Sequence, residues 1–299
     1  MPAPITDLQA IILGLLQGVS ELFPVSSLGH SVLAPALFGW HHLVSAQSAK
    51  HSFFLAFLVG LHVGTAAGLF VYYRRTWVAF ARALLERLRG VSSRGASSLW
   101  RLDDVTMDAN YRLLALLVVA TIPVGIAGVV FDSTLRVLFA KPLAAAIFLV
   151  VNGLILFGAE RLRRSQGRHA RLVSLETLSV RQAVAIGASQ SLALFAGISR
   201  SGVAMATGLA GGLNHEDAAQ FSFLLATPVI ALAGLYKLPE LFGATGQGVR
   251  TPAALGALCA AVTAYLSVRF LVRWFATKTL APFALYSLAL GLFGVTYFA

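Results

Sequence analysis

Two short stretches of an otherwise apolar chain carry the side chains that can do chemistry. The first, QGVSELFPVSSLGH at residues 17–30, places Gln17 and Glu21 four residues apart, so both side chains share one face of a helix. A carboxylate is costly in hydrocarbon, and an ionisable residue inside a membrane segment is a functional-site hypothesis by default. A structural ion pair between Glu21 and an arginine is the alternative.

The rest of this stretch breaks one helix and starts another. Pro24 ends the first helix, and Ser26 or Ser27 is placed to cap the second. His30 follows in the first turn of the second helix, on the side of Ser27. For His30, a functional role and a hydrogen-bonded packing role are both open.

The second stretch, AGISRSG at residues 196–202, supplies chemistry complementary to Glu21. Its serines, arginine and glycine place hydroxyls, a guanidinium and free backbone N–H groups at the start of a helix: Ser199, Arg200, Ser201 and Gly202. Helix N-termini attract anions, and arginine can hold a phosphate by two hydrogen bonds. The two stretches together therefore favour phosphate chemistry, although an ion pair between Arg200 and Glu21 would also explain the arginine.

The composition indicates where these stretches lie. The chain has 299 residues, of which 58% are hydrophobic and 12% are charged, against about 25% charged in soluble domains. Six apolar runs are each near the roughly 20 residues that cross a bilayer as a helix. The runs are 53–73, 113–131, 143–159, 218–236, 253–272 and 279–298. The sequence therefore predicts an all-α polytopic integral membrane protein.

The basic residues predict the orientation of this protein. Lysine and arginine total 23 against 12 acidic residues, and they gather in 74–112, 161–181 and 269–278. Only a few lie in 132–141 and 238–251. The positive-inside rule places the first three segments in the cytoplasm and both chain termini outside. Topology explains the basic excess, so we expect no nucleic-acid partner.

The first basic segment contains WVAFARALLERLRG, between residues 74 and 111. We expect a solvated connection with topogenic arginines here. A basic amphipathic helix lying on the inner leaflet is the alternative.

Two further apolar segments, 7–40 and 178–213, are too interrupted to span. Each is expected to form a re-entrant helix–break–helix hairpin, because irregular backbone at membrane depth needs protein or water around it. An offset of 173 residues aligns six identities in 21 positions. They pair Gln9 with Gln182, Ala10 with Ala183, Gly14 with Gly187, Gln17 with Gln190, Ser26 with Ser199, and Gly29 with Gly202.

This alignment predicts an inverted repeat within a single membrane domain, 1–299. The halves are approximately 1–160 and 178–299, joined by a basic cytoplasmic loop. An odd number of crossings inverts the second half, so the broken tips of the two hairpins should meet near the midplane. His62 and Asn152 can line that site, or they can simply join helices by hydrogen bonds.

The paired motifs resemble those of the bacterial undecaprenyl-diphosphate phosphatases, also called bacitracin-resistance proteins. Their E/Q-x-x-x-E and P-I/V-S-S-x-G-H motifs are matched by Gln17, Glu21, Pro24, Ser26, Ser27, Gly29 and His30. Their P-G-x-S-R-S-G-x-T motif is matched by Gly197, Ser199, Arg200, Ser201 and Gly202. The similarity extends over nearly the whole chain, through LHVGT, ATIPVGIAG, GAERLRR and FSFLLATPV.

The resemblance implies hydrolysis of a polyprenyl diphosphate to the monophosphate, which recycles the lipid carrier of cell-wall synthesis. It also implies a site in the bacterial cytoplasmic membrane, open to the outer (periplasmic) side, and a divalent cation, Mg²⁺ or Ca²⁺. Glu21 would hold the metal, with Gln17, or position water, and Arg200 would stabilise the phosphoryl oxygens. Ser27 or His30 would be the nucleophile or the proton-transfer group. Ser26, Ser27, Ser199, Arg200, Ser201 and Gly202 would bind phosphate.

Three positions depart from the family pattern. Gln17 stands where many members have glutamate, Ala196 replaces the usual proline, and Ala204 replaces the usual threonine. A transporter of the lipid monophosphate and a lipid-diphosphate binder without catalysis are the competing hypotheses. The sequence leaves open whether the protein forms a homodimer and which prenyl chain length it prefers.

Overall fold

The computed structural model describes residues 4–47, 52–90, 107–139, 141–165 and 173–299, without the side chains of 132–139 and of residue 245. Parts of the first two basic segments, 91–106 and 166–172, therefore lie outside the described residues. The described part is helical, with turns and one isolated β-bridge between Val173 and Leu213.

Six helices are long and apolar enough to cross a membrane, and each overlaps one of the six apolar runs. They are α4 (Phe53–Tyr72), α7 (Ala109–Phe139), α8 (Pro142–Ser165), α11 (His215–Phe242), α12 (Arg250–Phe275) and α13 (Ala281–Phe298). The predicted multi-pass, all-α fold is thus confirmed. The largest buried cluster joins spans from both halves of the chain, through residues such as Leu69, Leu116, Phe221 and Leu271.

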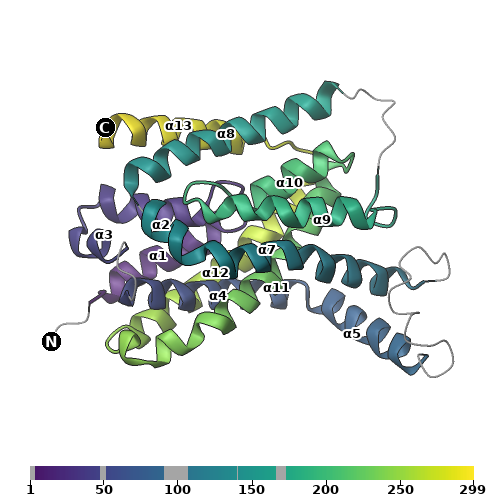
Figure 1. Ribbon diagram of the computed structural model, residues 1–299, viewed down its shortest axis with the longest axis horizontal. Helices are drawn as coiled ribbons and strands as arrows, with labels where there is room; N and C mark the ends of the chain where they lie inside the picture. Colours follow the sequence, from purple (N-terminus) through teal and green to yellow (C-terminus); the bar gives the residue numbers. More distant parts are fainter. Residues whose placement is uncertain (1–3, 48–51, 91–106, 140, 166–172) are drawn as a thin grey trace.

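The connection after α4 is helical where a solvated connection was expected. α5 (Arg74–Arg89) follows α4 after a single residue, Tyr73, and packs beside α7 (Figure 1). The helix considered as the alternative for this segment is thus present, and its position relative to a membrane stays a prediction. A short helix, α3 (His41–Gln47), was also not predicted.

Each of the two interrupted segments forms two short helices around a break. The first comprises α1 (Asp7–Ser20) and α2 (Ser27–Leu37). The second comprises α9 (Val180–Ser189), the 3-10 turn η2 (Gln190–Leu194) and α10 (Arg200–Ala210). In both, the two arms contact each other, which gives the expected hairpin shape. Their re-entrant course relative to a bilayer stays a prediction.

The caps of the two hairpins match at the predicted offset. Thr6 and Gln9 form a capping box at the start of α1, and Ser179 and Gln182 form the same box at the start of α9. After the breaks, the Ser26 hydroxyl accepts from the Gly29 N–H, and the Ser199 hydroxyl accepts from the Gly202 N–H. The capping boxes and these serine caps satisfy N–H groups that a helix start leaves free.

The first arm of each hairpin, α1 or α9, packs against a span from the other half of the chain. A Cβ added at Gly14 of α1 would lie 2.3 Å from the Gly256 carbonyl of α12. A Cβ added at Gly187 of α9 would lie 1.9 Å from the Ala120 carbonyl of α7. Small residues allow such close approach between membrane helices. This exchange agrees with an inverted repeat, although the equivalence of the complete halves stays a prediction.

Candidate active site

Glu21 lies at the centre of the candidate site, immediately after the last residue of α1. Its side chain is buried, and the residue is only 7% exposed. The Gln17 amide donates to its Oε2 at 2.9 Å, as expected from their spacing on one helix face. The Ser27 hydroxyl donates to the same Oε2. The carboxylate is therefore held by groups from both sides of the first break.

Arg200 brings the second break onto the same carboxylate. Its guanidinium pairs with Oε1 of Glu21, and the two side chains are 14% and 5% exposed. The ion pair considered as an alternative is thus present, and it joins residues 179 positions apart. Removing one member of a buried pair costs about 3–5 kcal/mol, because the other charge stays uncompensated. Such a pair is compatible with phosphate binding, since a phosphate can replace the carboxylate as the partner of the guanidinium.

Ser26 locks the two breaks together through their backbones. Among the described residues, it is the only non-glycine residue with a positive φ, at 69°. Its hydroxyl oxygen accepts from the N–H groups of Gly29 and Gly197, both at 3.2 Å. Gly197 itself has a φ of 113°, which favours glycine. The broken tips predicted to meet are therefore in direct contact.

Asn152 of α8, for which the sequence left open a place in the site or a helix–helix hydrogen bond, contacts both breaks. It is fully buried, and its amide donates to the Pro24 carbonyl at 3.0 Å. Its Oδ1 accepts from the Ser199 N–H at 2.9 Å. The amide also donates to Ser287 of α13 at 3.1 Å. One side chain thus joins both breaks and also links α8 to α13, so its contacts agree with both interpretations drawn from the sequence.

His30 is held by hydrogen bonds on both ring nitrogens. Nδ1 lies 2.7 Å from the Ser26 carbonyl and Nε2 lies 2.8 Å from the Tyr286 hydroxyl. Because a carbonyl only accepts, this network assigns the proton to Nδ1, and Tyr286 donates to Nε2 of the neutral ring. The two rings are also stacked, with centroids 5.7 Å apart. Neither nitrogen is bonded to Ser27 or Glu21.

His62 of α4 lies at the more open side of the carboxylate. Its Nε2 is 3.8 Å from Oε2 of Glu21, and its side chain is 30% exposed. Nδ1 is 2.8 Å from the Leu58 carbonyl, so Nε2 is the nitrogen that faces Glu21. Of the two sequence interpretations of His62, this contact favours a place in the site.

The remaining residues of the second motif build the start of α10. The Ser199 and Ser201 hydroxyls are 3.1 Å apart, and Ser199 also accepts from the Gly202 N–H at 3.1 Å. Ser201 lies 3.4 Å from the Glu21 carbonyl. These buried hydroxyls are engaged within the loop, so an anion would meet chiefly the guanidinium and the free N–H groups of the first turn.

The oxygen atoms around Glu21 fit a hard divalent cation that takes its remaining ligands from a phosphate or from water. Oε1 of Gln17 is buried and has no hydrogen-bond partner. It offers an oxygen ligand beside the carboxylate of Glu21 and the hydroxyl of Ser27. No group of three or more His, Cys, Asp or Glu side chains that could hold a metal is found in the described part of the chain. Mg²⁺ suits such sparse oxygen ligation, because it often takes phosphates and water as further ligands.

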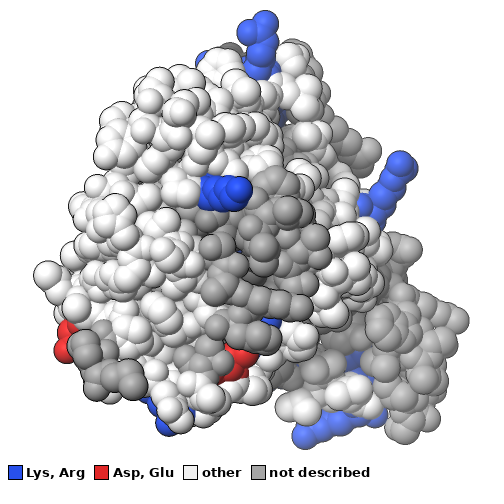
Figure 2. Space-filling model, turned by 60° about the vertical axis from the view of Figure 1, so that its left-hand side comes forward, with Lys and Arg blue, Asp and Glu red and all other residues white. Residues whose placement is uncertain are grey.

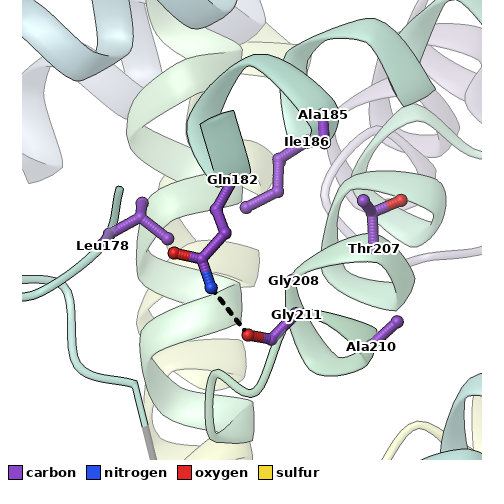
Figure 3. A pocket seen from close by; sticks show the side chains of 8 residues that line it. All are labelled: Leu178, Gln182, Ala185, Ile186, Thr207, Gly208, Ala210 and Gly211. Atoms are coloured by element: carbon purple, nitrogen blue, oxygen red, sulfur yellow. Dashed lines mark hydrogen bonds between the residues drawn. The ribbon is translucent and has the colours of Figure 1, made fainter. Parts of the chain in front are cut away.

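A separate cavity of about 240 Å³ opens between the arms of the second hairpin (Figure 3). Its lining is Leu178, Gln182, Ala185, Ile186, Thr207, Gly208, Ala210 and Gly211. Figure 3 shows the Gln182 amide turned onto the Gly211 carbonyl, a hydrogen bond of 2.8 Å. No charged side chain lines this cavity, so it offers no phosphate chemistry of its own.

The fold and site define a class: polytopic membrane proteins whose polar site lies where two discontinuous helices meet. The family model of the bacitracin resistance protein BacA matches residues 10–293, and the chain belongs to this family. It is 46% identical over 351 residues to an "Undecaprenyl-diphosphatase 2" of Frankia alni, covering 99% of this chain and 98% of that protein. It is 45% identical over 309 residues to an "Undecaprenyl-diphosphatase" of Mycolicibacterium paratuberculosis, covering 97% of both chains. A relative from Burkholderia lata, also named "Undecaprenyl-diphosphatase 2", is 41% identical over 289 residues, covering 96% of this chain and 95% of that protein.

Proposed function

We propose that the protein hydrolyses undecaprenyl diphosphate to undecaprenyl monophosphate and inorganic phosphate, and so recycles the lipid carrier of cell-wall synthesis. The observation that carries the proposal is the contact of Glu21 with both Ser27 and Arg200. It combines a base, a hydroxyl and a phosphate-binding cation within one buried site. The names of the similar proteins support the substrate.

Ser27 is the nucleophile favoured by this geometry. Its hydroxyl already donates to Glu21, whereas both nitrogens of His30 are bonded to Ser26 and Tyr286. Ser27 Oγ attacks the terminal phosphorus, its proton passes to Glu21, and the bond to the bridging oxygen breaks. The lipid monophosphate leaves, and a phosphoserine remains. Water then attacks this phosphoserine, which releases inorganic phosphate and restores the hydroxyl.

Arg200 binds the phosphate that undergoes attack. Before substrate binds, its guanidinium rests on Glu21. The arriving diphosphate takes over this guanidinium, so the buried arginine keeps an anionic partner in both states. Its hydrogen bonds then lie where negative charge develops during phosphoryl transfer. The same exchange frees the carboxylate of Glu21 to accept the proton of Ser27.

Glu21 and Gln17 would hold a divalent cation, through the carboxylate and the unpartnered Oε1 of the amide. When bound, the cation supplies charge neutralisation for the diphosphate oxygens. Gln17 contributes no charge, so a cation here would depend more on the diphosphate for ligands than one held by two carboxylates. His30 holds the turn at Ser26 through its Nδ1–H.

The site faces the outer side of the membrane in this proposal. The ends of α5 and α8 carry Arg87, Arg89, Arg163 and Arg164, and α12 ends near Arg273. The positive-inside rule assigns these ends to the cytoplasm. Figure 2 brings the left-hand side of Figure 1 forward, away from the free end of α5, and shows mainly uncharged residues with a few scattered basic and acidic side chains.

The test is release of inorganic phosphate from undecaprenyl diphosphate by the purified protein in detergent, with Mg²⁺, with Ca²⁺ and with a chelator. We expect cation-dependent release that falls to background in Arg200→Ala. Each variant must also be shown to be folded. A folded wild-type protein that releases no phosphate would contradict the proposal. Movement of labelled lipid monophosphate between leaflets would then favour a transporter, and retention of the diphosphate alone would favour a binder.

A further inference from the structure

α5 presents an apolar stripe to the outside of the protein. Its inner side packs through Phe80 and Ala83, which are 1% and 7% exposed. An adjoining side carries Val78, Leu85 and Leu88, which are 48%, 55% and 47% exposed. Their spacing of seven and three residues places them on one face of the helix. Large apolar side chains exposed on one face mark an interaction surface.

A basic line runs beside the apolar stripe. Arg75 and Arg82 are seven residues apart, are both exposed, and lie on the flank of the stripe away from the buried side. α5 carries five arginines and one glutamate in 16 residues. An apolar face flanked by arginines is the pattern of helices that lie in the membrane–water interface.

The position of α5 beside the end of a spanning helix places this surface at the level of the membrane–water interface. The Arg87 guanidinium lies 5.5 Å from the centroid of the Tyr111 ring, at the start of the span α7. Trp77 and Leu113 pack against the same buried cluster as Phe80. α5 therefore runs beside the end of a spanning helix that the basic residues assign to the cytoplasm, as Figure 1 also shows.

We propose that α5 is an interfacial helix that binds anionic phospholipids of the inner leaflet. Val78, Leu85 and Leu88 enter the acyl region, while Arg75 and Arg82 bind lipid phosphates. The arginine line favours an anionic lipid surface over a second copy of this chain, which has the same positive charge there. Each arginine near an anionic surface strengthens binding about fivefold. This surface is independent of hydrolysis at Glu21.

Spin labels on the full-length protein test the depth of α5. The chain has one cysteine, Cys259, so a Cys259→Ala background accepts a label at Leu85→Cys or, as the matched control, at Glu86→Cys on the neighbouring polar side. The labelled proteins are placed in vesicles of phosphatidylglycerol and phosphatidylcholine. We expect the Leu85 label to collide with oxygen in the acyl region and the Glu86 label to collide with a water-soluble nickel complex. A Leu85 label that meets the nickel complex, or neither probe because protein covers it, would overturn the proposal.

Lipid selectivity tests the arginines. Phosphatidylglycerol and phosphatidylcholine compete for binding to the purified Arg75→Gln/Arg82→Gln protein. The control variant, Lys141→Gln, removes a charge just before α8, at the end of the spans opposite to α5. We expect the preference of the wild type for phosphatidylglycerol to fall at least fivefold in the double variant and to stay in Lys141→Gln. An unchanged preference in the double variant would refute a role of these arginines in lipid binding.

Discussion

The Ser27 hydroxyl and the Glu21 carboxylate are in contact before any substrate arrives. This arrangement separates the two candidate nucleophiles that the motif alone could not distinguish. Ser27 contacts Glu21, the proposed base, whereas His30 lies between the Ser26 carbonyl and the Tyr286 hydroxyl. The distinction depends on which partner each side chain meets, and Tyr286 lies 256 residues from His30 in the chain.

Ser27→Ala should therefore reduce phosphate release by at least a hundredfold, because the proposed nucleophile is lost. Ser20→Ala is a matched control, since within the described residues its hydroxyl bonds only to the Leu16 carbonyl of the same helix. The measurement is a steady-state rate together with trapping of a phosphorylated protein from labelled substrate. Full activity of Ser27→Ala, or a trapped phosphate on His30, would exclude Ser27 as nucleophile.

Tyr286→Phe should slow hydrolysis, because the Nε2 of His30 loses its hydrogen-bond donor and the ring that holds the turn at Ser26 is less firmly placed. The measurement is the steady-state rate of phosphate release. Tyr297→Phe removes a hydroxyl from the same helix without a contact to His30, and it should behave as the wild type. If the two variants hydrolyse the substrate at the same rate, Tyr286 has no influence on His30.

At the scale of elements, the breaks are specified by single backbone positions. Gly197 has a φ of 113°, and a Cβ there would lie 2.3 Å from the Ala145 carbonyl. Both constraints act on the loop that donates the Gly197 N–H to Ser26. Ala196 replaces the proline that is usual in the family, so the shape of this loop depends on Gly197 and on the contact with Ser26.

Gly197→Ala should lower the free energy of unfolding by about 1–3 kcal/mol through backbone strain, with a further cost from the contact to Ala145. Gly125→Ala is the matched control, because nothing lies within 4 Å of a Cβ at that helical position. It should leave stability unchanged or raise it slightly. Thermal unfolding in detergent measures both. Equal midpoints for Gly197→Ala and the wild type would contradict the strain argument.

The sequence predicted the elements that composition alone determines. Six runs of about 20 apolar residues gave six spans, and the breaks were visible because Pro24 and the Gly197–Gly202 region interrupt apolar segments. α5 was expected to be a solvated connection because its apolar residues are interleaved with arginines. Asn152 and Tyr286 could not be assigned, since a lone polar residue in a span has many ordinary explanations and only the packed structure reveals its partner.

At the scale of the whole molecule, Glu160 ties three spans together at the basic end. This α8 residue is 3% exposed and accepts from His215 of α11 and, at 3.0 Å, from the N–H of Leu280 before α13. Arg164 approaches it at 3.9 Å but is 72% exposed. The cluster lies beside Arg164, near the end of the bundle that the basic residues assign to the cytoplasm.

Glu160→Gln should destabilise the protein by about 1–3 kcal/mol, because charge-assisted hydrogen bonds to a buried carboxylate are lost. Arg164→Gln should cost less than about 1 kcal/mol, as expected for an exposed pair. Thermal unfolding of both variants provides the comparison. A larger loss in Arg164→Gln than in Glu160→Gln would show that the surface charge, and not the buried carboxylate, holds this end together.

The packing of α1 from the first half against α12 from the second half also has a consequence for biosynthesis. α1 lies against α12 so closely that Gly14 and Gly18 meet the backbone at Gly256 and Ala260. The ribosome makes α1 first and α12 nearly last. During most of translation, Arg200 is not yet available to pair with Glu21, and α12 is not yet available to pack against α1. A lone carboxylate is disfavoured in hydrocarbon. The first hairpin therefore gains its ion-pair partner and its contact with α12 only late in translation, and a chain truncated before α12 would lack the helix against which Gly14 and Gly18 pack.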